Sequence, residues 1–220
     1  MKAQQGRARA QELCAQFTSA GDALGWFEAF YREARDGRIT VPWADRAPNT
    51  HLFEWYAQSH VDLRDKRCLT VGCGLGDDAE YLAEQGGRVV AFDIAQTAVA
   101  WCCERFPSSR VEYVAADLLS PPPDWAGGFD FVFEANTLQV LPVELRTQAM
   151  RNLSGFLAPH GTLLLVCRGR EESDPPGSMP WPLTREELQK GLGRLDLVSL
   201  GEHYDAGDQP VRRFRAVFCR

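Results

Sequence analysis

The feature that most constrains this chain is a glycine-rich loop at residues 71–78, between a short apolar run and an amphipathic one. The residues before it resemble a buried strand and those after it a helix, the context in which such a loop binds ligands. Glycine has no Cβ, so the loop can take positive φ angles and let a ligand approach the backbone closely. The pattern therefore predicts a ligand site where a strand meets the following helix.

The two acidic residues after the loop indicate what kind of ligand it binds. A dinucleotide-binding loop would read G-x-G-x-x-G, with the pyrophosphate at the helix N-terminus. Here the third glycine comes one residue early, and Asp77 and Asp78 would repel a pyrophosphate. S-adenosylmethionine carries a sulfonium and an ammonium group but no phosphate, so it fits better than NAD. We expect Gly72, Cys73, Gly74 and Asp77 to contact this cofactor.

Strand and helix patterns alternate from residue 67 onward, which predicts an α/β fold with a parallel sheet. The run at 163–166 is continuously apolar, as in a strand buried on both faces. The expected architecture is Rossmann-like, with a seven-stranded, mostly parallel sheet whose last strand is antiparallel. The strands are expected at 68–71, 88–92, 111–115, 129–133, 162–167, 196–200 and 214–219, and the helices between them at 78–85, 95–106, 143–157 and 184–192.

The N-terminal part of the chain reads differently. Helices are expected at 6–17, 22–34 and 49–59, because apolar residues such as Leu24, Phe27 and Tyr31 recur at helical spacing. We therefore predict a helical cap over residues 1–60, packed on a cofactor-binding domain over residues 61–220.

Three acidic residues follow predicted parallel strands, at the edge where doubly wound sheets bind ligands. Asp93 is expected to accept hydrogen bonds from the ribose hydroxyls, with Ile94 beside it in the site; its alternative role is a helix cap. Asp117 is expected to bind the adenine amino group while Leu118 covers the ring, the alternative being a turn residue. Glu134 is expected near the amino acid part of the cofactor or its methyl group, with helix capping or core hydrogen bonding as the alternative.

Composition narrows the possible partners. The net charge of −6 and the pI near 5.3 argue against nucleic acid, and no apolar run is long enough to span a membrane. No signal peptide is visible, and the seven cysteines show no metal-ligand spacing, so we expect no metal and a cytoplasmic setting. The vicinal Cys102 and Cys103 are expected on the buried face of a helix. The tail at 212–215 alternates like a half-exposed edge strand.

Together these motifs resemble the class I S-adenosylmethionine-dependent methyltransferases, across residues 67–220. More narrowly, Val-Pro-Trp at 41–43 and the proline-rich stretch before Leu-Thr-Arg-Glu-Glu-Leu at 183–188 resemble the thiopurine, thiol and halide methyltransferase branch. That resemblance implies that the N-terminal segment and the late loop close over the cofactor and the acceptor. Trp43 would then contact both, while Trp181 and Arg168 would contact the acceptor; for Arg168 a surface salt bridge is the alternative.

The chain departs from the class I pattern at Thr70, where most members have an acidic residue. Anchoring of the loop is therefore expected from the Thr70 hydroxyl or from Asp77 and Asp78. The branch also tends to place an acid directly after the tryptophan, whereas here Ala44 precedes Asp45.

The resemblance implies methyl transfer from S-adenosylmethionine to a small-molecule acceptor by in-line displacement, in which positioning supplies most of the catalysis. The sequence shows no convincing general base, so we assign no catalytic residue and expect a thiol or another soft nucleophile as acceptor. The alternatives are a nicotinamide-dependent oxidoreductase and a non-catalytic methyltransferase-like binding domain. The sequence does not predict the oligomeric state.

Residues 169–182 form a long connector rich in proline and glycine. Together with Trp43 this segment is expected to form a lid over the reacting methyl group, with Gly169 and Gly177 as hinges. The alternative is that Trp43 and Trp181 simply pack the N-terminal helices onto the sheet.

Overall fold

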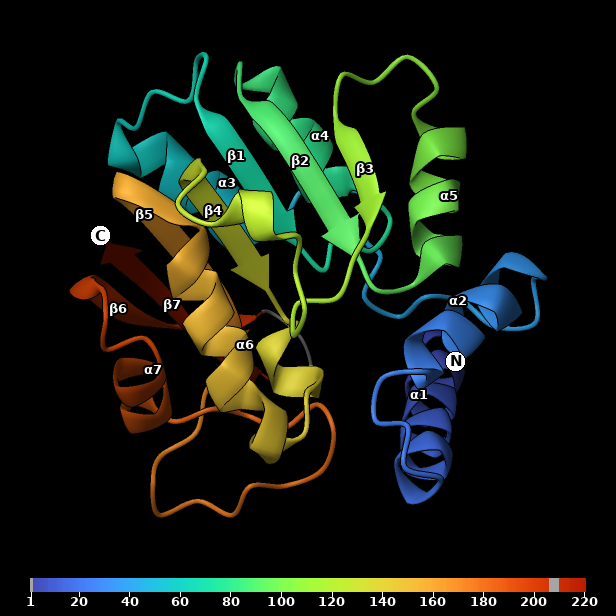
Figure 1. The fold of residues 1–220 in the computed structure, drawn as a ribbon. Helices are drawn as coiled ribbons and strands as arrows, with labels where there is room; N and C mark the ends of the chain where they lie inside the picture. The colour runs from blue at the N-terminus through green and yellow to red at the C-terminus, as the bar shows by residue number, and fades with distance from the viewer. Residues whose placement is uncertain (1, 206–209) are drawn as a thin grey trace.

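The computed structural model describes residues 2–205 and 210–220, and it places a seven-stranded sheet between two layers of helices (Figure 1). Three helices precede the first strand. In chain order the elements are α1 (Lys2–Ser19), α2 (Trp26–Arg35), α3 (Thr50–Ser59), β1 (Arg67–Val71), α4 (Asp77–Glu84), β2 (Arg88–Asp93), α5 (Gln96–Arg105), β3 (Glu112–Ala115), η1 (Pro123–Trp125), β4 (Phe129–Ala135), η2 (Leu138–Val140), α6 (Val143–Phe156), β5 (Leu157–Arg168), α7 (Arg185–Gly191), β6 (Asp196–Asp205) and β7 (Val211–Cys219).

The sheet has the strand order β3-β2-β1-β4-β5-β7-β6. Strands β1 to β5 pair in parallel, whereas β7 is antiparallel to both β5 and β6. The predicted α/β class, the seven strands and the antiparallel last strand are confirmed. The prediction that residues 212–215 lie on an edge strand is wrong, because β7 is inserted between β5 and β6, and β6 forms the edge.

Strand β5 shows why both faces of the sheet are covered. Leu163, Leu165 and Cys167 pack in the cluster beneath α6 and α7, while Leu164 and Val166 point to the opposite cluster, beneath α3 and α4. Alternate residues of a strand face opposite sides, so an unbroken apolar run can be stable only between two helical layers. Figure 1 shows α6 in front of the sheet and α3 and α4 behind it.

The strand order also fixes where a ligand can bind. The chain winds outward from β1 to β2 and β3, and then crosses back to β4 on the other side of β1. Connections therefore leave the carboxyl ends of β1 and β4 in opposite directions, and this switch point is where open α/β sheets bind ligands. The glycine-rich loop follows β1 at this edge.

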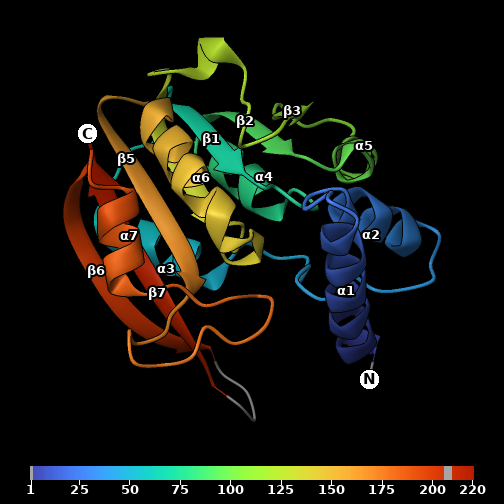
Figure 2. The ribbon, with the colours of Figure 1, turned by 60° about the horizontal axis from the view of Figure 1, so that its bottom comes forward.

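The N-terminal helices fall into two groups. Helices α1 and α2 form an apolar cluster of their own with Met179 from the late loop, and Figure 2 shows them beside the carboxyl edge of the sheet. Helix α3 instead packs against the sheet itself, where Leu52 is fully buried and Trp55 stacks on Phe131. The predicted division at residue 60 stays a prediction. Among the described residues, no helix combines the length and apolar character needed to cross a membrane.

Candidate functional site

The glycine-rich loop needs its glycines for steric reasons. Gly72, Gly74 and Gly76 have φ angles of +60°, +56° and +91°, a region that side chains strongly disfavour. A Cβ at Gly72 would lie 2.2 Å from the Thr137 hydroxyl, and one at Gly76 would lie 2.6 Å from the Tyr113 hydroxyl. The glycines are therefore required by the backbone conformation and by the side chains packed against the loop. The contact of the loop with a ligand stays a prediction.

The neighbouring strand β2 anchors the loop. The backbone N–H of Cys73 donates to the carbonyl of Phe92 at 2.8 Å, and that of Gly74 donates to the Asp93 carboxylate at 3.0 Å. The Thr70 hydroxyl, the anchor expected from the sequence, is buried and has no hydrogen-bond partner among the described residues. Anchoring by Thr70 is therefore wrong, because the carboxylate at the end of β2 already reaches the loop.

The two acidic residues after the loop both have protein partners. Asp77 accepts two hydrogen bonds from the Arg105 guanidinium, at 2.8 and 2.9 Å. Asp78 accepts the backbone N–H of Asn49 at 2.6 Å, and burial raises the pKa of its carboxyl to about 6. Arg105 thus supplies a counter-charge that sequence reasoning missed, and the contact of Asp77 with a cationic ligand stays a prediction.

Asp93 is buried at the carboxyl end of β2. Its two oxygens accept the N–H groups of Gly74 at 3.0 Å and Ala95 at 2.9 Å, and burial raises the pKa of the carboxyl to about 6. The bond to Ala95 is a local turn contact and does not cap the helix, because Ala95 itself is the N-cap of α5 and no side chain caps it. The capping contact considered as an alternative is therefore not formed. Each carboxylate oxygen can accept a second hydrogen bond, so the ribose contact remains open to it. The apolar side chain of Ile94 is exposed beside it.

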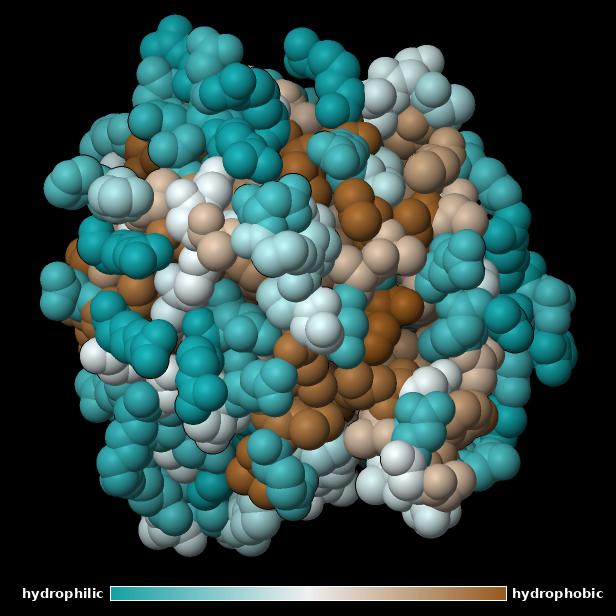
Figure 3. Space-filling view, viewed as in Figure 1, coloured by the Kyte–Doolittle hydropathy of each residue, from teal (hydrophilic) through white to brown (hydrophobic). Residues whose placement is uncertain are grey.

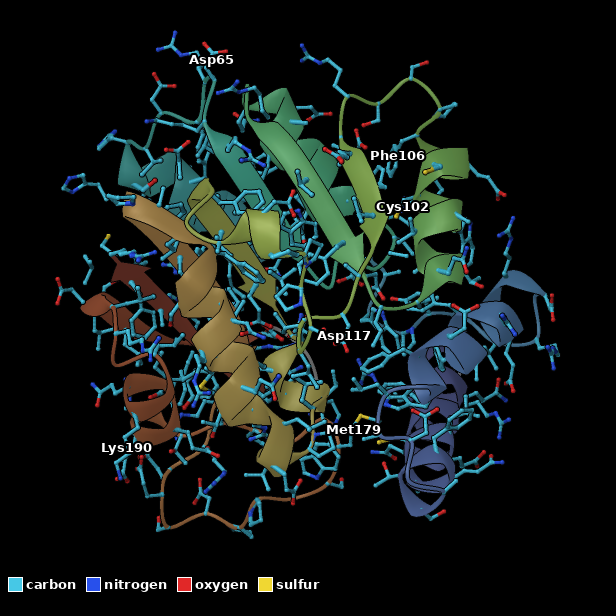
Figure 4. The ribbon with its side chains drawn as sticks, viewed as in Figure 1. Asp65, Cys102, Phe106, Asp117, Met179 and Lys190 are labelled. Carbon is cyan, nitrogen blue, oxygen red and sulfur yellow. The ribbon has the colours of Figure 1, made fainter. Side chains whose placement is uncertain are left out.

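Asp117 and Leu118 follow β3 at the same edge, and Figure 4 shows Asp117 on the side of the sheet that faces α1 and α2. The Asp117 carboxylate accepts the N–H of Leu119 at 2.8 Å, which is the turn geometry considered as an alternative. Leu118 is buried in the core cluster beneath α6. Their contacts with adenine stay predictions.

Glu134 is the most unusual polar group of the site. It is fully buried at the end of β4, paired in register with Val71, the residue before the loop. Its Oε1 accepts the N–H groups of Thr137 at 2.6 Å and Leu138 at 3.1 Å, while Oε2 has no partner among the described residues. Burial raises the pKa of this carboxyl to about 7. A buried acceptor without a donor is costly, and a ligand N–H group would satisfy it.

Trp43 and Trp181 both contact the N-terminal helices. Trp43 stacks on Phe30 with ring centroids 4.7 Å apart, and its indole N–H donates to the Tyr31 hydroxyl at 3.1 Å. It keeps 42% of its surface exposed. Trp181 packs against the α1–α2 cluster, and its backbone N–H donates to the carbonyl of Gln139 at 2.7 Å. These are the packing contacts considered as the alternative, and closure of a lid stays a prediction.

The late loop, residues 169–182, also touches α1. Met179 is buried in the α1–α2 cluster, and its carbonyl accepts a hydrogen bond from the Gln11 side chain at 2.7 Å. Gly177 has a φ of +69° and no neighbour within 4 Å of where its Cβ would be, and its role as a hinge stays a prediction. Gly169 is different, because a Cβ there would lie 2.8 Å from the Phe214 ring. Gly169 therefore permits close packing, which differs from the predicted hinge role.

Arg168 ends β5 beside this loop. Its backbone N–H donates to the buried Gln139 side chain at 2.6 Å, and its guanidinium forms no ion pair within the described residues. Burial and the neighbouring Arg213 and Arg7 lower the pKa of Arg168. The salt bridge considered as its alternative role is not formed in the described part, and an anionic acceptor group would offset this cluster of positive charge.

A polar network near the carboxyl ends of β4 and β5 was not predicted from the sequence. His51 Nε2 lies 3.1 Å from Asp205 Oδ1, and Arg213 donates to Asp205 Oδ2 at 2.7 Å. Arg213 also donates to the Asn136 side chain at 2.8 Å. Four separate segments supply these residues, and His51 and Asp205 are 154 positions apart. No local motif could have revealed this network.

The cysteines do not form a second site. Cys102 is buried and its thiol donates to the Gly74 carbonyl at 3.2 Å, while Cys103 is exposed. The prediction that both lie on the buried face is thus wrong for Cys103, which follows Cys102 by about 100° around the helix. Within the described residues, no three His, Cys, Asp or Glu side chains are arranged to hold a metal ion.

The surface around the site is partly apolar. Figure 3 shows hydrophobic side chains gathered between the carboxyl ends of the strands and helices α1 and α2. A glycine-rich loop with positive φ angles, a buried acceptor without a donor and a neighbouring apolar surface fit a ligand with an apolar ring and a cationic amine. The residues present therefore fit the predicted cofactor.

Comparisons with known proteins agree with this geometry. A family model described as a methyltransferase domain matches residues 68–161. The chain is 26% identical to 2-heptyl-1-hydroxyquinolin-4(1H)-one methyltransferase of Mycobacteroides abscessus, across 83% of this chain and 82% of that protein. It is 24% identical to a probable thiol methyltransferase 2 of Arabidopsis thaliana, across 83% and 77% of the two chains. Its fold resembles that of the N-methyltransferase NodS of Bradyrhizobium japonicum, solved with S-adenosyl-L-homocysteine, with a TM-score of 0.63 and 22% identity over 81% of this chain and 91% of NodS.

Proposed function

Because the chain belongs to the class I S-adenosylmethionine-dependent methyltransferases, we propose that it methylates a small molecule bearing a thiol or another soft nucleophile. The predicted family, enzyme class and cofactor are confirmed, and with them the resemblance to the thiol methyltransferase branch. The identity of the acceptor and the roles of the site residues belong to the proposal.

Bound S-adenosylmethionine supplies an electrophilic methyl group on a positively charged sulfur. The residues proposed to contact this cofactor are those of the loop, the strand ends and the aromatic cap: Trp43, Gly72, Cys73, Gly74, Asp77, Asp93, Ile94, Asp117, Leu118 and Glu134. Asp93 would accept hydrogen bonds from the ribose hydroxyls, and Glu134 Oε2 would accept one from the ammonium group. Asp117 would take the adenine amino group.

The observation that carries this assignment is the unpartnered Oε2 of Glu134. It lies at the end of β4, whose neighbour β1 leads directly into the glycine-rich loop. A cationic amine held there would stabilise the buried carboxylate and would place the rest of the cofactor over the loop. A pyrophosphate at the same place would be repelled, because both it and the Glu134 carboxylate are negatively charged.

The acceptor is proposed to lie on the side of Trp43, Arg168 and Trp181. A thiol is favoured by the similarity to the probable thiol methyltransferase, and thiolates need little assistance to attack a methyl group. An acidic ring hydroxyl is the second candidate, because the protein 26% identical to this chain bears the name of a hydroxyquinolinone methyltransferase. Both candidates are small molecules with an ionisable X–H group.

A mass-spectrometric screen tests the proposal. The enzyme would be incubated with S-adenosylmethionine and small thiols, selenols, halides and phenols, and both the methylated product and S-adenosylhomocysteine would be measured. We expect turnover with one or more thiols. Turnover confined to phenols would exclude the thiol class and support the hydroxyl candidate, while turnover confined to amines would exclude both.

We further propose that residues 1–60 form a cap on the domain of residues 61–220 and that Trp43 and residues 169–182 close over the bound ligands. Met179 and Gln11 already join this loop to α1. Limited proteolysis with and without S-adenosylhomocysteine tests closure. We expect the ligand to suppress cleavage within 169–182, and cleavage at an unchanged rate would contradict the lid.

A further inference from the structure

His51 is a buried histidine with one ring nitrogen close to a carboxylate and the other without a hydrogen-bond partner among the described residues. It is the second residue of α3 and keeps only 9% of its surface exposed. Nε2 lies 3.1 Å from Asp205 Oδ1, whereas Nδ1 is buried and has no partner among the described residues. A neutral imidazole that donates through Nε2 carries a lone pair on Nδ1 and can accept a proton there.

One set of contacts ties this histidine to the glycine-rich loop. Asn49 caps α3 by accepting the backbone N–H of His51 at 3.0 Å. The backbone N–H of Asn49 in turn donates to Asp78 at 2.6 Å, in the first turn of the helix that leaves the loop. These contacts hold the N-terminus of α3 close to the start of α4, next to the glycine-rich loop proposed to bind the cofactor.

A second set of contacts ties His51 to the end of β4. Asp205 accepts from Arg213 at 2.7 Å, and Arg213 donates to Asn136 at 2.8 Å. Asn136 follows Glu134 by two residues, so the network reaches the place proposed for the amino acid part of the cofactor. His51 itself packs against β6 and β7, and these two sets of contacts connect it to the helix after the loop on one side and to the end of β4 on the other.

Asp205 is held in its charged form. Burial opposes ionisation, but hydrogen bonds from Arg213 and His51 outweigh it and keep the pKa of Asp205 below its usual range. A charged carboxylate on Nε2 fixes the tautomer and stabilises the imidazolium that forms when Nδ1 takes a proton. The pair therefore has the arrangement of a general base and its positioning residue.

We infer that His51 is the general base of the transfer, accepting the acceptor's proton on Nδ1, and that Asp205 is its positioning residue. This inference rests on the proposed function. The acceptor's X–H bond breaks and its proton passes to Nδ1. The electron pair of X forms the new bond to the methyl carbon as the carbon–sulfur bond of the donor breaks, leaving its electron pair on sulfur. Water later removes the proton from the imidazolium.

The inference also defines the acceptor class. A base on the enzyme is needed only when the X–H group is largely protonated at working pH, as in an alkyl thiol or a phenol. An acceptor that is already anionic would gain nothing from Nδ1. When a protonated acceptor gives up its proton to His51, the positive Arg168 and Arg213 near the network would orient the resulting anion.

Other titratable and charged groups also face His51. The groups facing it from the packed elements are Asp205 and His203 on β6, Arg213 and Arg215 on β7, and Glu54 on α3. Arg215 donates to the His51 carbonyl and pairs with Glu54, and burial together with Arg215 and His51 lowers the pKa of His203. A pH effect is assigned to His51 only if it disappears in a His51 variant.

The test compares acceptors of graded acidity in wild-type enzyme and His51→Gln. Glutamine can keep a hydrogen bond to Asp205 but cannot accept a proton. At pH 7 we expect kcat/KM to fall about 100-fold or more for alkyl thiols or phenols, within the usual range for general-base catalysis. For a nitro-substituted thiophenol, which is already ionised, we expect a loss below about threefold. An equal loss for both acceptors, or no loss for either, would overturn the inference.

Two further variants complete the design. Asp205→Asn should lower kcat/KM more for the protonated acceptor than for the ionised one, and it should shift the acid limb of the pH–rate profile for the protonated one. His160→Asn is the matched control, because His160 is an exposed residue near the start of β5 with positive φ, which asparagine tolerates; its profile should be unchanged.

Imidazole NMR gives a readout independent of turnover. The His51 ring signals should show a tautomer protonated on Nε2, and Asp205→Asn should change the tautomer or its titration. A ring protonated on Nδ1 instead would overturn the inference. If wild-type enzyme methylates no acceptor, the proposed function fails; if it is active and His51→Gln keeps the same acidity dependence, only the inference fails.

Discussion

The cofactor half and the acceptor half of the site are built in different ways. The proposed cofactor half is centred on the glycine-rich loop and the carboxylate at the end of β2, which lie within residues 71–93, and Asp93 holds Gly74 directly. Asp117 and Glu134, at the ends of β3 and β4, are proposed to complete it. The proposed acceptor half combines Trp43, Arg168 and Trp181 with a network of His51, Asn136, Asp205 and Arg213, whose four residues come from four distant segments. A local motif thus defines the cofactor, while only the tertiary fold defines the acceptor chemistry.

The difference has a physical origin. A bound nucleoside needs a backbone turn that a ligand can approach closely and a carboxylate, and these are supplied by a turn with positive φ angles and by the strand end at Asp93. A general base needs a buried imidazole and a partner of opposite charge, which can come from any elements that meet in space. Each half should therefore respond to its own set of substitutions.

The largest expected effect is on the cofactor half, from Asp93→Ala. This change removes two proposed hydrogen bonds to the ribose, each contributing roughly 1.5–3 kcal/mol, so affinity for S-adenosylhomocysteine should fall more than about 100-fold. Calorimetric titration measures it, and thermal unfolding reports on the lost bonds to Gly74 and Ala95. Asp62→Ala, at an exposed aspartate, is the control. Weakening of tenfold or less would mean that Asp93 only anchors the backbone at Gly74 and Ala95.

Glu134→Gln should produce a smaller effect that depends on pH. Because burial raises the pKa of Glu134 from 4.5 to about 7, the folded protein retains a proton that the unfolded chain loses between these values. Stability of the ligand-free enzyme therefore decreases as pH rises through this window. Binding of a cationic amine needs the ionised form, so wild-type affinity for S-adenosylhomocysteine should increase about tenfold from pH 6 to pH 8.

In Glu134→Gln this increase should be lost. Titrations at pH 6, 7 and 8 compare the two proteins, and any dependence left in the variant reports on the other buried carboxyl, Asp93, whose pKa is about 6. Parallel pH profiles in wild type and variant would show that Glu134 does not contact the amine.

The smallest effect is expected from Asp117→Asn. The amide oxygen can still accept a hydrogen bond from the adenine amino group and from Leu119, so affinity for S-adenosylmethionine should drop only about two- to fivefold. Asp117→Ala should weaken it further. Unchanged affinity in the alanine variant would remove Asp117 from the site and confine the cofactor half to the loop and Asp93.

Sequence reasoning was most successful where the pattern was local. The unbroken apolar run of β5 indicated a strand buried on both faces, and the sheet confirms it. It was misleading where the outcome depended on distant partners. The sequence indicated an unpaired charge at Asp77, but the structure pairs it with Arg105 of α5. The loop was expected to be anchored by Thr70, but Asp93 anchors it instead. Residues 212–215 alternate like an edge strand, yet β6 covers them.

The histidines show the same limit more clearly. His51 carries no motif, and its partner Asp205 is 154 residues away, at the end of β6. Only the packing of α3 against the sheet, together with the antiparallel insertion of β7, brings the two side chains together. For this reason the sequence alone could not have predicted His51 as a general base.

The separation of the two halves is tested most directly by titrating S-adenosylhomocysteine into His51→Gln and wild-type enzyme under identical conditions. We predict dissociation constants within about twofold of each other, together with the loss of turnover for protonated acceptors. A dissociation constant raised more than about tenfold in His51→Gln would show that the histidine belongs to the cofactor half, and it would contradict the division of the site proposed here.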